Sequence, residues 1–177
     1  MAKQKIITLS GKARHGKDLS CNIIKKILQE KGKRVLMINY ADFLKYLASE
    51  YLNWNGRKDE KGRTILQELG NEKVEKFPCF WVDTVINITK LFEDDYDYVL
   101  IGDCRFPHDI NRWKEEGYDI FPIHVERLNY DNGLTKEQKN HPTEVALNDF
   151  KFMVNIKARS LNELESEIKR HVINLIT

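Results

Sequence analysis

The chain has 177 residues, the size of one domain, and it is long enough to bury a core without disulfides or a structural metal. Hydrophobic residues make up 41% and charged residues 32%, a balance that is typical of a soluble globular protein and argues against intrinsic disorder. The formal net charge of +2 gives no global field favouring nucleic acid or a membrane surface as partner, and no apolar run approaches the length of a membrane span.

The first predicted elements are a strand, a helix and a second strand. Residues 6–9 form a short apolar run, and a helical pattern with one apolar face follows over 19–28. Gly32 is placed to end this helix, because glycine adopts a positive φ at little cost. Residues 35–38 are again continuously apolar, which is typical of a parallel sheet covered on both faces.

The middle of the sequence is mainly helical. We expect helices over 40–54 and 64–76, with an exposed polar loop between them, and a further helix around 81–91. Residues 98–101 predict a third buried strand, and a short helix is expected near 109–116.

The last third repeats the alternation of strands and helices. A fourth strand is expected at 120–125 and a weaker one at 152–156, and the polar stretch 128–142 between them predicts a mobile lid. The final helix begins with the capping-box pattern Ser160–Glu163. The sequence therefore predicts a single three-layer α/β domain over 1–177.

A glycine-rich segment lies directly between the first strand and the first helix: Gly11-Lys12-Ala13-Arg14-His15-Gly16-Lys17-Asp18. It fits the G-x-x-x-x-G-K pattern, in which glycines let backbone N–H groups wrap a phosphate and the helix start adds its dipole. Lys17 would then reach the outer phosphates of ATP. The predicted ATP contacts are this segment, Leu19 and Arg127, which ends the fourth strand. The plainer alternative is an ordinary strand-to-helix turn.

Asp18 stands where serine or threonine usually follows the lysine and binds Mg²⁺. A carboxylate can bind Mg²⁺ directly or through water, so Asp18 is a candidate metal ligand. The alternative is that Asp18 only caps the helix. Arg14, inside the loop, either contacts the nucleotide or points into solvent.

A second candidate group follows the third strand. Ligands of such folds bind at the carboxyl ends of the strands, so Asp103 is placed to hold Mg²⁺ through water and Arg105 to grip a phosphate. The alternative is a surface turn in which these two side chains pair with each other. Asp42, at the end of the second strand, either contacts an acceptor's sugar or base or caps the following helix.

Four short segments resemble, in order, those of deoxynucleoside monophosphate kinases of phage and bacterial type. Besides the glycine-rich loop with its Gly-Lys-Asp, they are Tyr40–Lys45, Arg63–Gly70, Asp103–Asp109 and His141–Glu144, and the start of the last helix is similar too. His108 and Asp109 depart from the family's Asn-Glu, and 157–159 lack its usual Asn and Gly.

The resemblance implies an ATP- and Mg²⁺-dependent kinase of the nucleoside monophosphate kinase fold, with acceptor-binding helices over about 40–90 and a lid over about 128–142. It implies catalytic roles for Lys17, Asp103 and Arg105. The implied acceptor contacts are Asp42, Lys45, Arg63, Gln67 and Arg105.

Two other functions stay open at this point. Phosphomevalonate kinases of animal type share a Gly-Lys-Asp loop, so another phosphorylated small molecule is an alternative acceptor, and a nucleotide-binding switch protein without small-molecule transfer is a further alternative. The expected partners are small-molecule nucleotides, and whether the chain forms a homodimer stays open. Trp54, Trp81 and Trp113 are expected to serve packing.

The three cysteines, Cys21, Cys79 and Cys104, are odd in number and form no C-x-x-C pair. This argues against a disulfide framework and a zinc site, and it favours a reducing compartment. The first residues lack the apolar run of a signal peptide, so we expect a cytoplasmic protein.

Overall fold

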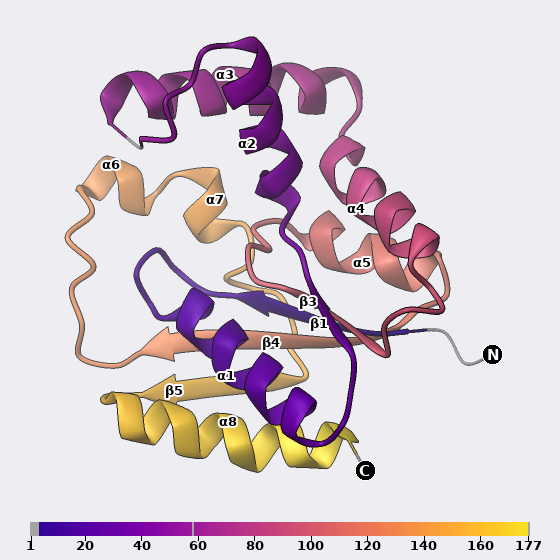
Figure 1. Cartoon of the computed structure of the whole chain (residues 1–177). Coiled ribbons are helices and arrows are strands. Elements are labelled where there is room, and N and C mark those ends of the chain that lie inside the picture. The colour runs from indigo at the N-terminus through magenta and orange to yellow at the C-terminus, as the bar shows by residue number, and fades with distance from the viewer. Residues whose placement is uncertain (1–3, 58, 177) are drawn as a thin grey trace.

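The structure is a computed structural model, and it describes residues 4–57 and 59–176. Its centre is a sheet of parallel strands in the order β2-β3-β1-β4-β5 (Figure 1). The strands are β1 (Lys5–Ser10), β2 (Val35–Met37), β3 (Tyr98–Ile101), β4 (Asp119–Arg127) and β5 (Val154–Ala158). The parallel α/β architecture predicted from the continuous apolar strands is therefore confirmed.

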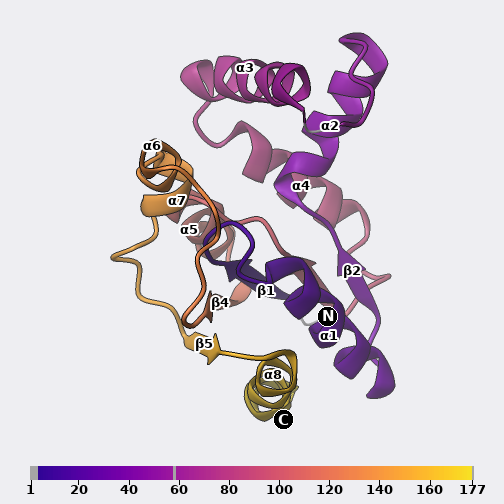
Figure 2. The same ribbon diagram turned by 90° about the vertical axis from the view of Figure 1, so that its left-hand side faces the viewer.

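Helices cover both faces of this sheet. On one face α1 (Lys17–Glu30) packs beside α8 (Leu161–Ile176), and their buried apolar residues form one core with those of β1, β4 and β5. On the other face α4 (Phe80–Leu91) and α5 (Pro107–Glu115) enclose a second core, in which Trp113 is fully buried. Figure 2 shows the sheet between these two helical layers.

The remaining helices gather at the carboxyl end of the strands. Helix α2 (Tyr40–Tyr51) follows β2, and α3 (Glu60–Lys76) packs against α2 and α4. The short helices α6 (Lys136–Lys139) and α7 (Pro142–Val145) lie in the connection between β4 and β5, on the same side of the sheet as the turn after β1 (Figure 1). These positions frame the site described below.

Several boundaries differ from the sequence prediction for local reasons. Helix α3 begins inside the polar stretch expected to be a loop, because Asp59 Oδ1 accepts the N–H of Gly62 at 2.8 Å. The expected capping box of α8 is only half formed. Ser160 Oγ accepts the N–H of Glu163 at 3.2 Å, but the Glu163 carboxylate accepts the N–H of Arg159, not that of Ser160.

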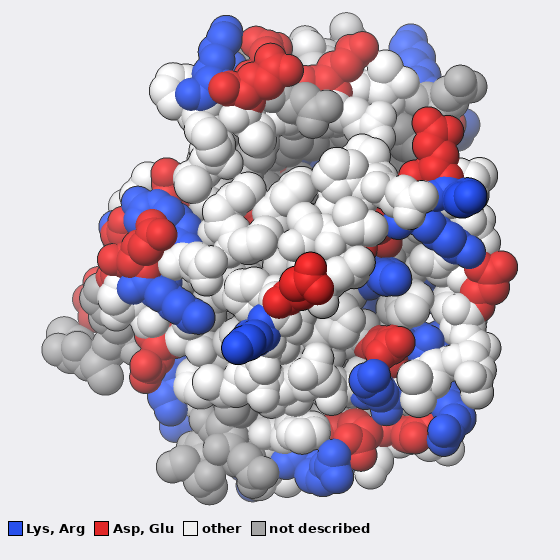
Figure 3. Space-filling view, turned by 180° about the vertical axis from the view of Figure 1, so that it is seen from behind, with Lys and Arg blue, Asp and Glu red and all other residues white. Residues whose placement is uncertain are grey.

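The surface carries charges of both signs. Figure 3 shows acidic and basic side chains interspersed on the back of the molecule around a broad uncharged area. This agrees with the small net charge of +2. Within the described residues, no helix is both long and apolar enough to traverse a bilayer.

Candidate functional site

The turn between β1 and α1 has a conformation that depends on its glycines. Gly11 has a φ of 149°, and a Cβ added there would lie 2.3 Å from the carbonyl oxygen of Val125. Gly16, at the N-cap of α1, has a φ of 92°. Both values lie in the region that side chains disfavour, so the loop can wrap this closely only with glycine at both positions.

Lys17 points back into this loop. Its Nζ donates to the carbonyl oxygens of Gly11 at 2.8 Å and Lys12 at 2.9 Å. The side chain is buried, and this burial, together with the nearby charge of Arg105, lowers its pKa to about 8. The positive charge of Lys17 is therefore only partly compensated by its protein surroundings, and it lies where the sequence predicts a phosphate.

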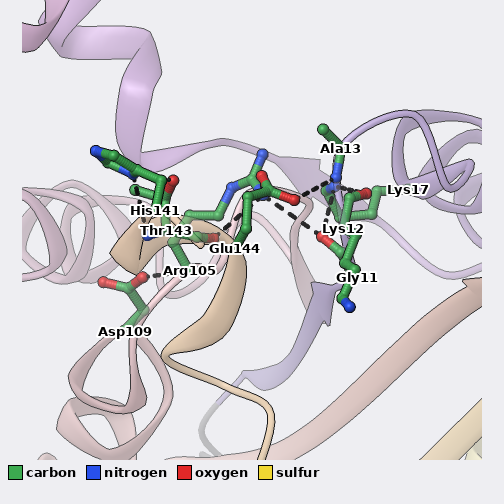
Figure 4. A network of polar contacts seen from close by, with 9 residues as sticks. All are labelled: Gly11, Lys12, Ala13, Lys17, Arg105, Asp109, His141, Thr143 and Glu144. Atoms are coloured by element: carbon green, nitrogen blue, oxygen red, sulfur yellow. Dashed lines mark hydrogen bonds and ion pairs between the residues drawn. The ribbon is translucent and has the colours of Figure 1, made fainter. Parts of the chain in front are cut away.

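Arg105 and Glu144 lie against the same loop (Figure 4). Arg105 Nη1 donates to Glu144 Oε1 at 2.9 Å, and the other carboxylate oxygen of Glu144 accepts the N–H of Ala13 at 2.9 Å. The Arg105 guanidinium also lies 3.5 Å from the carbonyl oxygen of Gly11. The backbone of Arg105 is fixed by Asp109, whose carboxylate accepts its N–H at 2.8 Å. The arginine is thus held beside the loop from two directions.

Asp103 is bound to the start of α2. Its two carboxylate oxygens accept the N–H groups of Tyr40 and Ala41, each at 3.0 Å. Burial raises its pKa to about 6, although both hydrogen bonds act in the opposite direction. The ion pair between Asp103 and Arg105 that was the plainer sequence interpretation is not formed, since Arg105 pairs with Glu144.

A cavity of about 500 Å³ opens next to Arg105, between α2, α3, α4, α5 and α7. Its lining combines Asp103, Arg105 and Asp109 with aromatic and apolar side chains. Sequence reasoning missed the aromatic ones, Tyr40, Trp81, Phe106 and His108. Trp81 was expected only to pack, but it also lines this cavity. The sequence gives no sign of this position, because it depends on the packing of α4 beside α5.

A second cavity, of about 200 Å³, lies against residues 14–16 of the loop and the end of β4. Residues from three predicted ATP-binding segments line it, namely Arg14, His15, Gly16, Leu19 and Arg127, together with 158–161 and Leu164. The guanidinium of Arg127 lies 4.0 Å from the centre of the Tyr130 ring, and Arg14 donates to the carbonyl oxygen of Asn132 at 2.9 Å. Half of the residues expected to contact ATP therefore line one pocket.

Other predicted residues lie outside these cavities. Asp42 and Lys45 pair with each other at 3.2 Å on the exposed side of α2. The N-cap of α2 is Asn39 and not Asp42, but the Asp42 carboxylate accepts the N–H of Asn39 at 2.8 Å and so takes part in capping the helix, as the second alternative expected. Gln67 is exposed on α3, and the side chain of Arg63 lies outside the described part of the chain.

Asp18 is exposed in the first turn of α1. Gly16 occupies the N-cap position, so the alternative interpretation of Asp18 as the cap was wrong. The negative charges of Asp18 and Asp103 both act to raise the pKa of Lys17, so both carboxylates lie within electrostatic range of its ammonium group. Within the described residues, no cluster of three or more His, Cys, Asp or Glu side chains forms a metal site of its own.

Comparison with known proteins gives the class of the fold. No protein-family model and no curated protein sequence matches the chain. Among solved structures, the Mycobacterium tuberculosis APS kinase CysC in complex with AMPPNP and APS is 12% identical, with a TM-score of 0.57 and full coverage of both chains. Its Cys556Ala mutant is 15% identical, with a TM-score of 0.55 and 99% coverage of both chains.

A third solved structure, APE1195, is 14% identical with a TM-score of 0.56, and the match covers 99% of this chain and 97% of the other. The chain therefore shares the parallel α/β fold of these solved structures. At these identities the likeness concerns the fold, and the resemblance to deoxynucleoside monophosphate kinases stays a prediction.

Proposed function

We propose that the protein transfers the γ-phosphoryl group of ATP to a nucleoside or deoxynucleoside monophosphate, yielding the diphosphate. One observation carries this proposal above the others: Arg105 lines the 500 Å³ cavity and also reaches to 3.5 Å from the carbonyl oxygen of Gly11. A phosphate held by Arg105 in the cavity would lie beside a phosphate held in the loop. Transfer between two phosphates requires this adjacency.

The roles follow from the positions. The amide groups of the loop and Lys17 would hold the β- and γ-phosphates, and the pocket lined by Leu19 and Arg127 would receive the nucleoside of ATP. Arg105 would hold the acceptor's phosphate. No general base is required, because the attacking phosphate oxygen is already anionic near neutral pH. Catalysis is then positioning and electrostatic stabilisation.

Mg²⁺ fits this arrangement as a bound partner of the phosphates. It usually binds through one or two carboxylates, with phosphates and water completing its shell, and the carboxylates of Asp18 and Asp103 both lie within electrostatic range of Lys17. Bound there, it would neutralise charge on the phosphates. Asp103 would serve through water, since each of its oxygens already accepts one backbone N–H.

The acceptor cavity favours a base-bearing substrate. Its walls carry Tyr40, Trp81 and Phe106 together with the side chains of Arg105 and Asp109. Such a combination suits a molecule with a flat ring at one end and a phosphate at the other. A purely aliphatic phosphorylated acceptor would use the arginine but not the aromatic wall.

The test is ADP formation from ATP with a panel of acceptors. The panel contains ribo- and deoxyribonucleoside monophosphates, APS, phosphomevalonate and a reaction without acceptor, and Lys17→Ala serves as the inactive control. We expect ADP formation that depends on a nucleoside monophosphate. Formation without any acceptor would indicate a hydrolysing switch protein, and dependence on APS or phosphomevalonate alone would reject the proposed acceptor class.

A further inference from the structure

Glu144 occupies an unusual place for an acidic side chain. It lies on α7, in the connection between β4 and β5, yet its carboxylate reaches the loop after β1. Each of its oxygens has one partner at 2.9 Å: Oε2 accepts the N–H of Ala13, and Oε1 accepts from Arg105. Only 8% of the side chain is exposed. The contact is therefore a buried bridge and not a loose surface pair (Figure 4).

The amide that Glu144 binds belongs to the phosphate-binding turn. Backbone N–H groups in such turns bind phosphate oxygens, and a carboxylate offers the same negative charge and the same kind of acceptor atom. The charge of Glu144 also acts favourably on the ammonium form of Lys17. Glu144 thus supplies negative charge to two groups that a phosphate bound in the turn would also contact.

The helix that carries Glu144 is short and locally stabilised. His141 Nδ1 accepts the N–H of Thr143 at 3.3 Å at the start of α7, and Pro142 follows in the first turn. The carbonyl oxygen of Thr143 lies 3.5 Å from Arg105 Nη1. Glu144 and Thr143 therefore both contact Arg105. A displacement of α7 from the loop would also change the surroundings of this arginine.

We propose that Glu144 is an internal substitute for a phosphate oxygen, which occupies the Ala13 amide while the loop is empty and leaves it when a triphosphate binds. This inference rests on the proposed function, because it assumes that the loop receives a triphosphate. It adds a consequence for the acceptor side. When Glu144 moves away, Arg105 loses its carboxylate partner and becomes available to an acceptor phosphate, so binding of the donor prepares the acceptor site.

The experiment compares binding of inorganic triphosphate and of ATP to the wild-type chain, Glu144→Gln and Glu137→Gln, by titration calorimetry. Glu137→Gln removes the same charge from an exposed position on α6 and serves as the matched control. With the competing carboxylate neutralised, Glu144→Gln should bind both ligands roughly three- to tenfold more tightly. Glu137→Gln should bind them within twofold of the wild type. A purely structural role for Glu144 would weaken binding instead.

Circular dichroism melting of each variant shows whether it folds. If Glu144→Gln is unfolded, Glu144→Asp replaces it in the experiment. The aspartate side chain is one methylene shorter and cannot contact both Ala13 and Arg105, so this variant should also bind triphosphate more tightly than the wild type. Equal or weaker binding by the folded variant, with normal binding by the wild type, would overturn the role of Glu144 and leave the proposed function standing. Failure of the wild type to bind either ligand would reject both.

Discussion

Asp103, just beyond the end of β3, accepts the backbone N–H of Tyr40, the first residue of α2, at 3.0 Å. This bond and its companion to Ala41 attach α2 to the sheet at the edge where the site lies. The same residue lines the cavity of about 500 Å³. Asp103, which the sequence predicts to hold a metal through water, thus also positions the start of α2, which forms one wall of the cavity.

Replacing Asp103 should therefore affect stability as well as activity. Asp103→Ala leaves two N–H groups at a helix start without their acceptor and should lower the free energy of unfolding by about 1–3 kcal/mol. Asp103→Asn keeps one acceptor oxygen and should cost less. Urea denaturation of the three proteins measures this order, and equal stability of all three would show that the bonds contribute nothing.

The pH dependence of that comparison has a definite sign. Burial raises the pKa of Asp103 to about 6, above the usual value for an unfolded chain. The folded state then binds its proton more tightly, and the stabilisation from that proton is lost as the pH rises through about 6. As the pH falls from 8 to 5, the free energy of unfolding of the wild type should therefore increase relative to that of Asp103→Asn. A constant difference would contradict the burial of this carboxyl.

Lys17 is expected to be essential for turnover. Its ammonium group lies within the loop, 2.8 Å from the carbonyl oxygen of Gly11. Lys17→Ala should lower kcat on the order of a hundredfold or more, because the charge on the transferring group is no longer neutralised. Circular dichroism should show the fold intact. A variant with unchanged kcat would reject the proposed mechanism.

Nucleotide binding should weaken at alkaline pH. Because burial lowers the pKa of Lys17 to about 8, its ammonium form is lost above that pH in the empty protein, whereas the phosphates of ATP are fully ionised there. The dissociation constant for ATP should rise by up to about tenfold per pH unit above 8. Lys17→Arg, which stays charged, should show a flat profile between pH 7 and 9.5. A wild-type profile as flat as that of the variant would contradict this role of the lysine.

Arg105 should act mainly on the acceptor. Arg105→Ala removes a guanidinium that lines the cavity, so the KM for the acceptor should rise by roughly ten- to a hundredfold. ATP affinity should change by less than about threefold, since Lys17 and the loop amides remain. Arg105→Lys keeps the charge without the planar fork and should lie between the two. Loss of ATP binding in Arg105→Ala would move this residue to the donor side.

The sequence predicted local structure correctly where the conformation of a segment depends mainly on its own residues. Continuous apolar strands predicted the parallel sheet, and Gly11 and Gly16 marked a turn whose φ values now require glycine. Signals were weaker for polar residues with several available partners. Asp42 could be expected either at the acceptor or at the helix start, and it pairs with Lys45 and the Asn39 amide, each three residues away along the chain.

The sequence by itself determined the order of strands and helices and the place of the glycine-rich turn after β1, because hydrophobic period and glycine conformation are local properties. It did not indicate that Glu144 would meet Ala13 or that Trp81 and Phe106 would share a cavity with Arg105. Residues 13 and 144 are far apart along the chain, and only the parallel pairing of β1 with β4 and of β4 with β5 brings their segments to one edge of the sheet. Several connections between strands and helices meet at that edge, and the packing of the whole fold decides which of their polar side chains come into contact.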